Sequence, residues 1–148
     1  MQIYLGADHR GFELKNKLRD WLKAEGHQVT DLGAQEYEAN DDYPDYAFSV
    51  GEAVAKTPNT RGIVVCGSGT GADVAANKVR GVRASLIHDP ALAKFAQEHD
   101  NINVLALGSD FIDEARAKAV VEAWLASAYS GEERHTRRIK KIEEYEQK

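Results

Sequence analysis

The 148-residue sequence has few of the features that indicate a disulfide-bonded, secreted or membrane protein. Its one cysteine excludes a disulfide within the chain and a metal or redox site of the CxxC type. No apolar run approaches the ~20 residues of a membrane span, and residues 1–8 lack a signal-peptide pattern. The net charge of −5 gives no general reason to expect nucleic acid binding. We therefore expect a cytoplasmic protein without nucleic acid or membrane partners.

Strand and helix signals alternate from one end of the chain to the other. The apolar runs that predict strands lie at residues 2–7, 28–32, 62–65, 82–87 and 104–107. Helical spacing of apolar residues, with Gly and Pro at the expected ends, predicts helices over residues 11–25, 44–56, 72–78, 90–98 and 112–128, and a last charged helix over 132–148.

This alternation predicts an α/β fold in one domain, residues 1–148. Repeated βα units imply a Rossmann-like three-layer sandwich, in which helices cover both faces of a five-stranded parallel sheet. We expect the strand order 2-1-3-4-5. Ligands in such sheets bind at the carboxyl ends of the strands where the order reverses, and here Asp8-His9 follows strand 1 and Cys66 ends strand 3.

The segment Cys66–Gly71 (CGSGTG) places a thiol, two hydroxyls and several unencumbered amides at the start of a helix. Such amides bind anions, and anion-binding surroundings favour a reactive thiolate. Taken alone, Cys66 could equally be a small buried hydrophobe, and Ser68 and Thr70 could simply satisfy the loop backbone. The segment lacks the Gly-Lys-Ser/Thr of a Walker A loop, and its third glycine is misplaced for a dinucleotide motif, although Asp89 follows at about the right distance.

Three further groups have both a structural and a functional interpretation. Asp8-His9 could cap a helix or contact a ligand at the switch point. Arg134 and Arg138 are four residues apart, so both project from one helical face, where they could be solvated or bind a phosphate monoester. His27 and His88 have no such placement, and we expect them to be surface or structural residues.

His99 closes a helix that runs back toward the amino ends of the strands. Within one subunit we therefore expect it to lie far from Cys66. Alone it reads as a histidine at a helix C-terminus. If it is catalytic, it serves the site of a neighbouring subunit.

Together these residues resemble the type B ribose-5-phosphate isomerases and the related galactose-6-phosphate isomerase subunits. The resemblance extends over nearly the whole chain. The segments that carry it, in order, are residues 6–12 (GADHRGF), 42–47 (DYPDYA), 66–71 (CGSGTG), 75–78 (AANK), 98–99 (EH), 103–108 (NVLALG) and 134–135 (RH).

The resemblance implies an aldose–ketose isomerase that interconverts ribose 5-phosphate and ribulose 5-phosphate through an enediolate, without a metal or other cofactor. Cys66 would be the base, because the glutamate that some members carry in the loop is replaced by Ala72. Ser68 would assist proton movement between the two oxygens, and His99 and Asp8 would help to open the furanose ring.

The resemblance also implies how the substrate is held. The amides of Gly67, Gly69, Thr70 and Gly71 would bind the enediolate oxygen, and His9, Arg134 and Arg138 would bind the phosphate. Family members form dimers or dimers of dimers with sites between subunits. We therefore expect a homodimer or larger assembly, in which the C-terminal helix of residues 132–148 contacts the partner.

Two positions depart from the family pattern. Asp100, at a substrate-binding position, replaces the usual asparagine, and Asp110 stands where ribose-specific members often carry a phosphate-binding arginine. Each adds negative charge near an anionic ligand. Two alternatives therefore stay open: the same chemistry on a six-carbon sugar phosphate such as allose or galactose 6-phosphate, or on an unphosphorylated sugar, and a non-catalytic module that binds a nucleotide or sugar phosphate.

Overall fold

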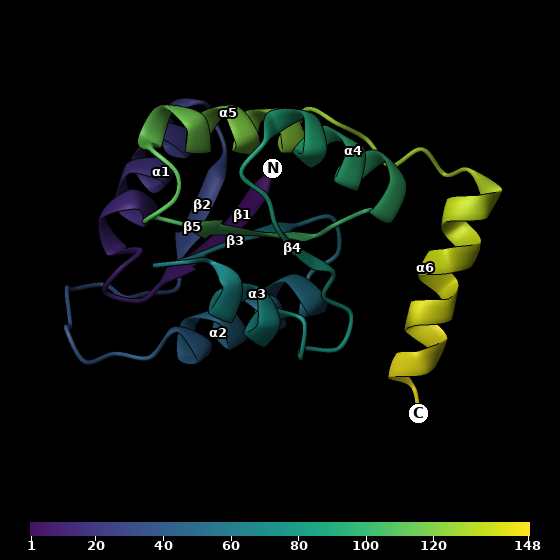
Figure 1. Ribbon diagram of the computed structural model, residues 1–148, viewed down its shortest axis with the longest axis horizontal. Coiled ribbons are helices and arrows are strands. Elements are labelled where there is room, and N and C mark those ends of the chain that lie inside the picture. Colours follow the sequence, from purple (N-terminus) through teal and green to yellow (C-terminus); the bar gives the residue numbers. More distant parts are fainter.

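Strands and helices alternate along the chain in the computed structural model, which describes all residues 1–148 (Figure 1). The strands are β1 (Gln2–Ala7), β2 (Gln28–Asp31), β3 (Arg61–Cys66), β4 (Ala84–Leu86) and β5 (Val104–Gly108). The helices are α1 (Phe12–Ala24), α2 (Tyr43–Lys56), α3 (Thr70–Ala76), α4 (Pro90–Asp100), α5 (Glu114–Leu125) and α6 (Glu133–Glu146). Every predicted element is present, with ends that shift by a few residues.

The five strands form one parallel sheet, which confirms the predicted fold class, but its order is β2-β1-β3-β5-β4. The prediction placed strand 4 beside strand 3, and here β5 takes that place. The physical reason lies in the apolar content of the two strands. All five residues of β5 are buried, whereas β4 has three residues and each is only half-buried. The more apolar strand β5 lies inside the sheet, and the shorter strand β4 is the outermost strand on that side.

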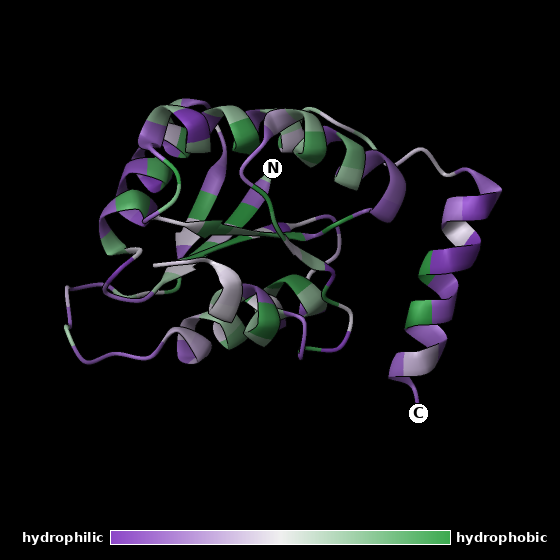
Figure 2. Ribbon diagram, in the orientation of Figure 1, coloured by the Kyte–Doolittle hydropathy of each residue, from purple (hydrophilic) through white to green (hydrophobic).

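Helices cover both faces of the sheet, so the core has two parts. Helices α1, α4 and α5 pack over one face, and α2 and α3 over the other (Figure 1). Their apolar residues gather on the sides turned toward the sheet (Figure 2). The side chains of each strand alternate between the two parts: in β3, Ile63 and Val65 contribute to the first, and Val64 and Cys66 to the second.

Polar residues fix where several helices begin. Asp89 accepts a hydrogen bond from the amide of Leu92 at 2.9 Å, and Asp113 accepts one from Arg116 at 2.7 Å, so each carboxylate caps a helix. Pro44 lies in the first turn of α2, as the sequence predicts. Asp89, the acid that a dinucleotide motif would have used, therefore has a structural role.

Helix α6 stands apart from the three layers (Figure 1). Only His135 and Ile139 are buried on it, whereas Ile142 and Tyr145 are 51% and 73% exposed. Its contacts with the rest of the chain include a 3.1 Å hydrogen bond from the Gly81 amide to Glu146. No helix of the protein combines the length and apolar character of a membrane span.

One buried ion pair ties α1 to the end of β2. Lys15 is fully buried, and its Nζ donates to both oxygens of Asp31 at 2.8 Å and to the carbonyl oxygen of Ala34 at 2.5 Å. Burial lowers the pKa of Lys15, although the bonded Asp31 carboxylate acts in the opposite direction. A buried pair of this kind contributes little on balance while it is complete, but removing one partner is costly.

We therefore expect Lys15→Met to lower the free energy of unfolding by about 3 kcal/mol, because Asp31 loses its main cationic partner. Lys56→Met is the matched control, since Lys56 pairs with Glu52 on the exposed face of α2, and we expect it to cost less than ~0.5 kcal/mol. Urea denaturation measures both values. Equal losses in the two variants would contradict this account of the buried pair.

Candidate active site

The carboxyl ends of β1 and β3 lie side by side, as the predicted switch point requires. Ala7 pairs with Val65 in the sheet, so Asp8 follows one strand beside Cys66 at the end of the other. The turn that follows β1 packs closely against β3: a Cβ added to Gly11 would lie 2.5 Å from the carbonyl oxygen of Val65. The structure thus brings the Asp8-His9 turn and the glycine loop to the same edge of the sheet.

Cys66 points into the glycine loop that follows it. The residue is 4% exposed, and the amide of Gly69 donates to its Sγ at 3.2 Å. Gly69 has a φ of +81°, a left-handed conformation that favours glycine, and α3 begins at the next residue. The loop thus supplies an amide donor to the sulfur, which suits a site where negative charge develops.

The hydroxyls of the loop bind each other. Ser68 Oγ and Thr70 Oγ1 are 2.6 Å apart, and the amide of Thr70 donates to Ser68 Oγ at 3.3 Å. This supports the structural interpretation of both residues, namely that they satisfy the loop. Both residues belong to the loop that follows Cys66.

The glycines of the loop allow close approach by neighbouring groups. A Cβ on Gly71 would lie 2.5 Å from the ring of Tyr43, and one on Gly67 would lie 2.6 Å from Arg10 Nε. On the other side, a Cβ on Gly108 would collide with the carbonyl group of Ser68. The loop is thus enclosed by α2, by the turn after β1 and by the end of β5.

Asp8 has a structural role in the turn that follows β1. It is 5% exposed, and its Oδ1 accepts hydrogen bonds from the amides of Arg10 and Gly11, both at 3.1 Å. The carboxylate therefore caps the turn into α1. Only Oδ1 is used in this way.

His9 is oriented by Asp41, a residue that the sequence analysis did not single out. Asp41 Oδ1 lies 2.7 Å from His9 Nδ1 and accepts from the His9 amide at 2.8 Å, which leaves Nε2 for a ligand. Burial raises the pKa of Asp41, but the hydrogen bonds from His9 outweigh this effect, so the pKa is lowered. The hydroxyl of Tyr46 acts in the same direction, although the buried Asp41 Oδ2 has no partner in hydrogen-bond geometry.

One cluster of side chains could ligate a metal ion, namely Asp8, His9 and Asp41. Each offers a ligand atom, and the three atoms lie within 4.8 Å of one another. Their hydrogen bonds to the turn and to each other already account for this closeness. The cluster therefore carries no assignment of a metal.

The other site residues that the sequence predicts lie at the opposite edge of the sheet, where the strands have their amino ends. Helix α4 ends at Asp100 and β5 begins at Val104, so His99 lies where strands start, whereas Cys66 lies where they end. The His99 ring stacks on the buried His135 ring with centroids 4.2 Å apart. Within one chain, then, His99 and Cys66 do not meet, as the sequence predicts.

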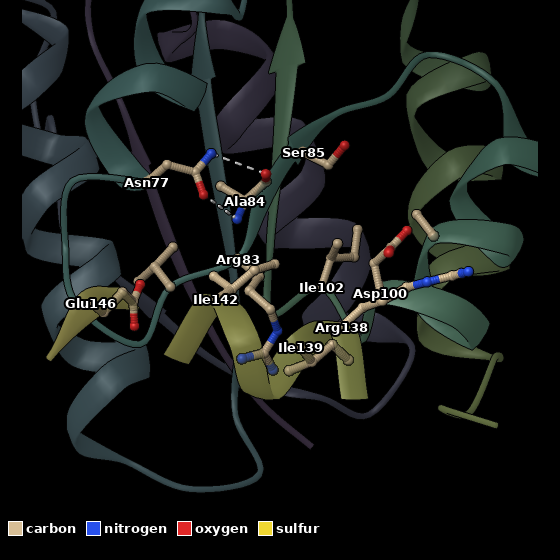
Figure 3. A pocket seen from close by; sticks show the side chains of 12 residues that line it. Asn77, Arg83, Ala84, Ser85, Asp100, Ile102, Arg138, Ile139, Ile142 and Glu146 are labelled. Atoms are coloured by element: carbon tan, nitrogen blue, oxygen red, sulfur yellow. Dashed lines mark hydrogen bonds between the residues drawn. The ribbon is translucent and has the colours of Figure 1, made fainter. Parts of the chain in front are cut away.

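Asp100 and Arg138 lie beside His99, between α4 and α6. Both line a cavity of about 350 Å³, to which Arg138 contributes from α6 and Asp100 from the end of α4 (Figure 3). Arg134 is on the same helix, where its Nε donates to Glu132 at 3.0 Å. The predicted phosphate ligands therefore divide into His9 at one edge of the sheet and the two arginines at the other.

Comparison with known proteins identifies the family. The family model for ribose/galactose isomerases matches residues 3–142. The chain belongs to the ribose/galactose isomerase family. Ribose-5-phosphate isomerase B of Mycobacterium tuberculosis is 41% identical to it, over 99% of this chain and 90% of that one.

Solved structures of this family agree with the fold. Ribose-5-phosphate isomerase B of Mycoplasma genitalium, with bound ribulose 5-phosphate, superposes with a TM-score of 0.95 at 42% identity, covering 99% of this chain and 97% of that one. The type B enzyme of Trypanosoma cruzi gives a TM-score of 0.94 at 35% identity over 99% of both chains. The resemblance drawn from the sequence motifs is thus confirmed for the family.

His88 contacts the end of β5, beside the glycine loop. The amide of Gly108 donates to His88 Nε2 at 3.0 Å, and Gly108 lies against Ser68 in the glycine loop. An Nε2 that accepts a hydrogen bond carries no proton. Burial correspondingly lowers the pKa of His88 below its ordinary value of 6.5. The contact joins the ends of the paired strands β4 and β5, and no local motif in the sequence marks it.

We expect His88 to make the protein less stable in acid. Its lowered pKa means that the unfolded chain binds the proton more readily, so stability is unaffected by His88 above about pH 6.5 and falls as the pH drops below that value. His88→Gln keeps an acceptor for Gly108 but does not titrate. Denaturant unfolding at about pH 7.5 and 5.5 should therefore show a smaller fall in the variant.

His135 adds a second decline that wild type and variant share, because burial and then the neighbouring His99 also lower its pKa. The informative quantity is thus the difference between the two falls. Identical falls would mean that His88 does not titrate with unfolding.

Proposed function

We propose that the chain is an isomerase that interconverts ribose 5-phosphate and ribulose 5-phosphate. Family membership over residues 3–142 supports the reaction class, and the names of the relatives favour the five-carbon substrate. The observation that carries the proposal is the buried Cys66 thiol, which accepts a hydrogen bond from the Gly69 amide at the start of a glycine-rich loop. A six-carbon sugar phosphate or an unphosphorylated sugar is the alternative substrate.

The chemistry requires one base and one anion site. Cys66 as thiolate takes the proton from C2 of the open-chain aldose, and the electron pair moves to the carbonyl oxygen to form an enediolate. The amides from Gly67 to Gly71 hold the developing charge. Cys66 then returns the proton to C1, while Ser68 helps a proton pass from O2 to O1. The product is the ketose, and no electrons enter or leave.

If Cys66 is the base, Cys66→Ala should lower kcat about 10²–10⁴-fold, since this is the usual contribution of a positioned base. Conversion of ribose 5-phosphate to ribulose 5-phosphate is the assay, and thermal unfolding shows that the variant is folded. Activity within tenfold of wild type would remove Cys66 from this role.

The same assay separates an enzyme from a binding module. A folded wild-type protein that binds sugar phosphates without turning over any member of a sugar panel would favour the non-catalytic alternative. In that case Cys66→Ser should leave the affinity unchanged.

We further propose that the complete site lies between two subunits. One chain holds Cys66, Asp8 and His9 at one edge of its sheet and His99, Arg134 and Arg138 at the other. A second copy must then supply His99 for ring opening, together with the two arginines for the phosphate and the residue at position 100. An exposed ring beside His99 supports a contact there: the ring of Phe95 lies 3.8 Å from that of His99, centroid to centroid, and Phe95 is 52% exposed.

Mixing inactive Cys66→Ala and His99→Ala subunits tests the shared site. After statistical exchange half the dimers are mixed, and each has one intact site, so we expect about a quarter of wild-type activity. Mass spectrometry verifies the mixed dimers. If verified mixed dimers stay inactive, Cys66 and His99 belong to one subunit's site.

A further inference from the structure

Arg10 has a fixed backbone position beside the glycine loop. Its amide donates to Asp8 Oδ1 at 3.1 Å, and its carbonyl oxygen accepts from Ser109 Oγ at 2.7 Å. Ser109 in turn donates its amide to the carbonyl oxygen of Cys66 at 2.9 Å. The backbone of Arg10 is thus joined to the ends of both β3 and β5.

The side chain of Arg10 extends across the first glycine of the loop. A Cβ on Gly67 would lie 2.6 Å from Arg10 Nε and 2.8 Å from its Cζ, so the guanidinium covers Gly67 directly. Gly67 is the residue after Cys66. The positive charge therefore lies next to the loop that the proposed reaction uses.

Asp110 holds the guanidinium in this place. Arg10 Nη2 donates to Asp110 Oδ2, and the Asp110 amide donates to the carbonyl oxygen of Gly67 at 2.9 Å. The two side chains remain 57% and 43% exposed. Exposed ion pairs contribute little to folding stability, so the fold does not depend on this contact.

The guanidinium keeps donors for a ligand. It has five N–H groups, and Nη2 is the nitrogen that Asp110 engages. Planar donors of this kind match a phosphate monoester. Arg10 also lines a surface hollow of about 440 Å³ together with His9, whose Nε2 is free.

Other cations are less suited to this position. Lys17 lines the same hollow, but it is held by Glu13 at 3.1 Å and lies 3.5 Å from Glu114. Arg134 and Arg138 of the same chain lie at the opposite edge of the sheet, on α6. Arg10 is therefore the arginine that this chain contributes beside its own His9 and Cys66.

We propose that Arg10 binds the phosphate group of the substrate directly, beside His9. The proposal rests on the isomerase function proposed above for the choice of sugar phosphate. The proposed contact joins a guanidinium to a phosphate group, so binding measurements can detect it in the absence of turnover.

The first test compares Arg10→Gln with wild type by calorimetry, using ribose 5-phosphate, inorganic phosphate and unphosphorylated ribose. We expect the Kd of the two phosphates to rise about 10-fold to 100-fold, since a charge-assisted hydrogen bond is lost. The affinity for ribose should stay the same. Lys17→Gln is the matched control and should bind all three as wild type does.

A second variant separates direct binding from simple neutralisation of Asp110. In Arg10→Gln, the unpaired Asp110 also repels the phosphate. Arg10→Gln/Asp110→Asn removes this repulsion, and we expect it to recover only part of the lost affinity. Full recovery would mean that Arg10 acts only by neutralising Asp110, and would overturn the proposal.

Two other results would also overturn it: unchanged phosphate affinity in Arg10→Gln, or an equal loss of affinity for ribose. Thermal unfolding should be the same in all variants, because the pair is exposed. Wild-type turnover of ribose 5-phosphate is measured separately, so a failure of the isomerase function is distinguished from a failure of Arg10 to bind phosphate.

Discussion

The arrangement of this protein depends on the shared direction of its strands. In a parallel sheet every strand ends at the same edge, and every covering helix runs back to the opposite edge. Groups that follow strands, such as Asp8 and Cys66, therefore gather at one edge. Groups at the C-terminal ends of helices, such as His99 in the last turn of α4, gather at the other. One chain can build each half of the proposed site but cannot bring the two halves together.

The glycine loop shows how closely chemistry and packing are joined at the first of these edges. Cys66 belongs to the apolar core beneath α2 and α3, yet its sulfur receives an amide from the loop above it. Tyr43, Arg10 and the end of β5 occupy the space that side chains would need at the glycines. The same absence of side chains that exposes the amides to a ligand thus also lets three segments hold the loop in place.

Much of this could be predicted from the sequence, because the decisive signals are local. Apolar periodicity, Pro44 and the glycines located the elements, and the alternation of elements fixed the parallel sheet. Strand order is not local. The exchange of β4 and β5 depends on which strand is more thoroughly apolar over its length, and it moved Gly108, Ser109 and Asp110 beside Cys66. The contacts of His88, Asp41 and Arg10 could not be foreseen for the same reason: each joins segments distant in sequence.

That exchange of strands also bears on the two acids that depart from the family pattern. With β5 beside β3, Asp110 reaches Arg10 across Gly67, and its charge is paired. Asp100 lies at the other edge, in the cavity that Arg138 also lines. The charge of Asp110 is therefore offset by Arg10, whose guanidinium keeps further donors for an anion. Asp100 shares only the lining of a cavity with Arg138, so its charge has no such partner within the chain. The two acids thus differ in their consequence for an anionic substrate, because local pairing of charges decides it and the net charge of the chain does not.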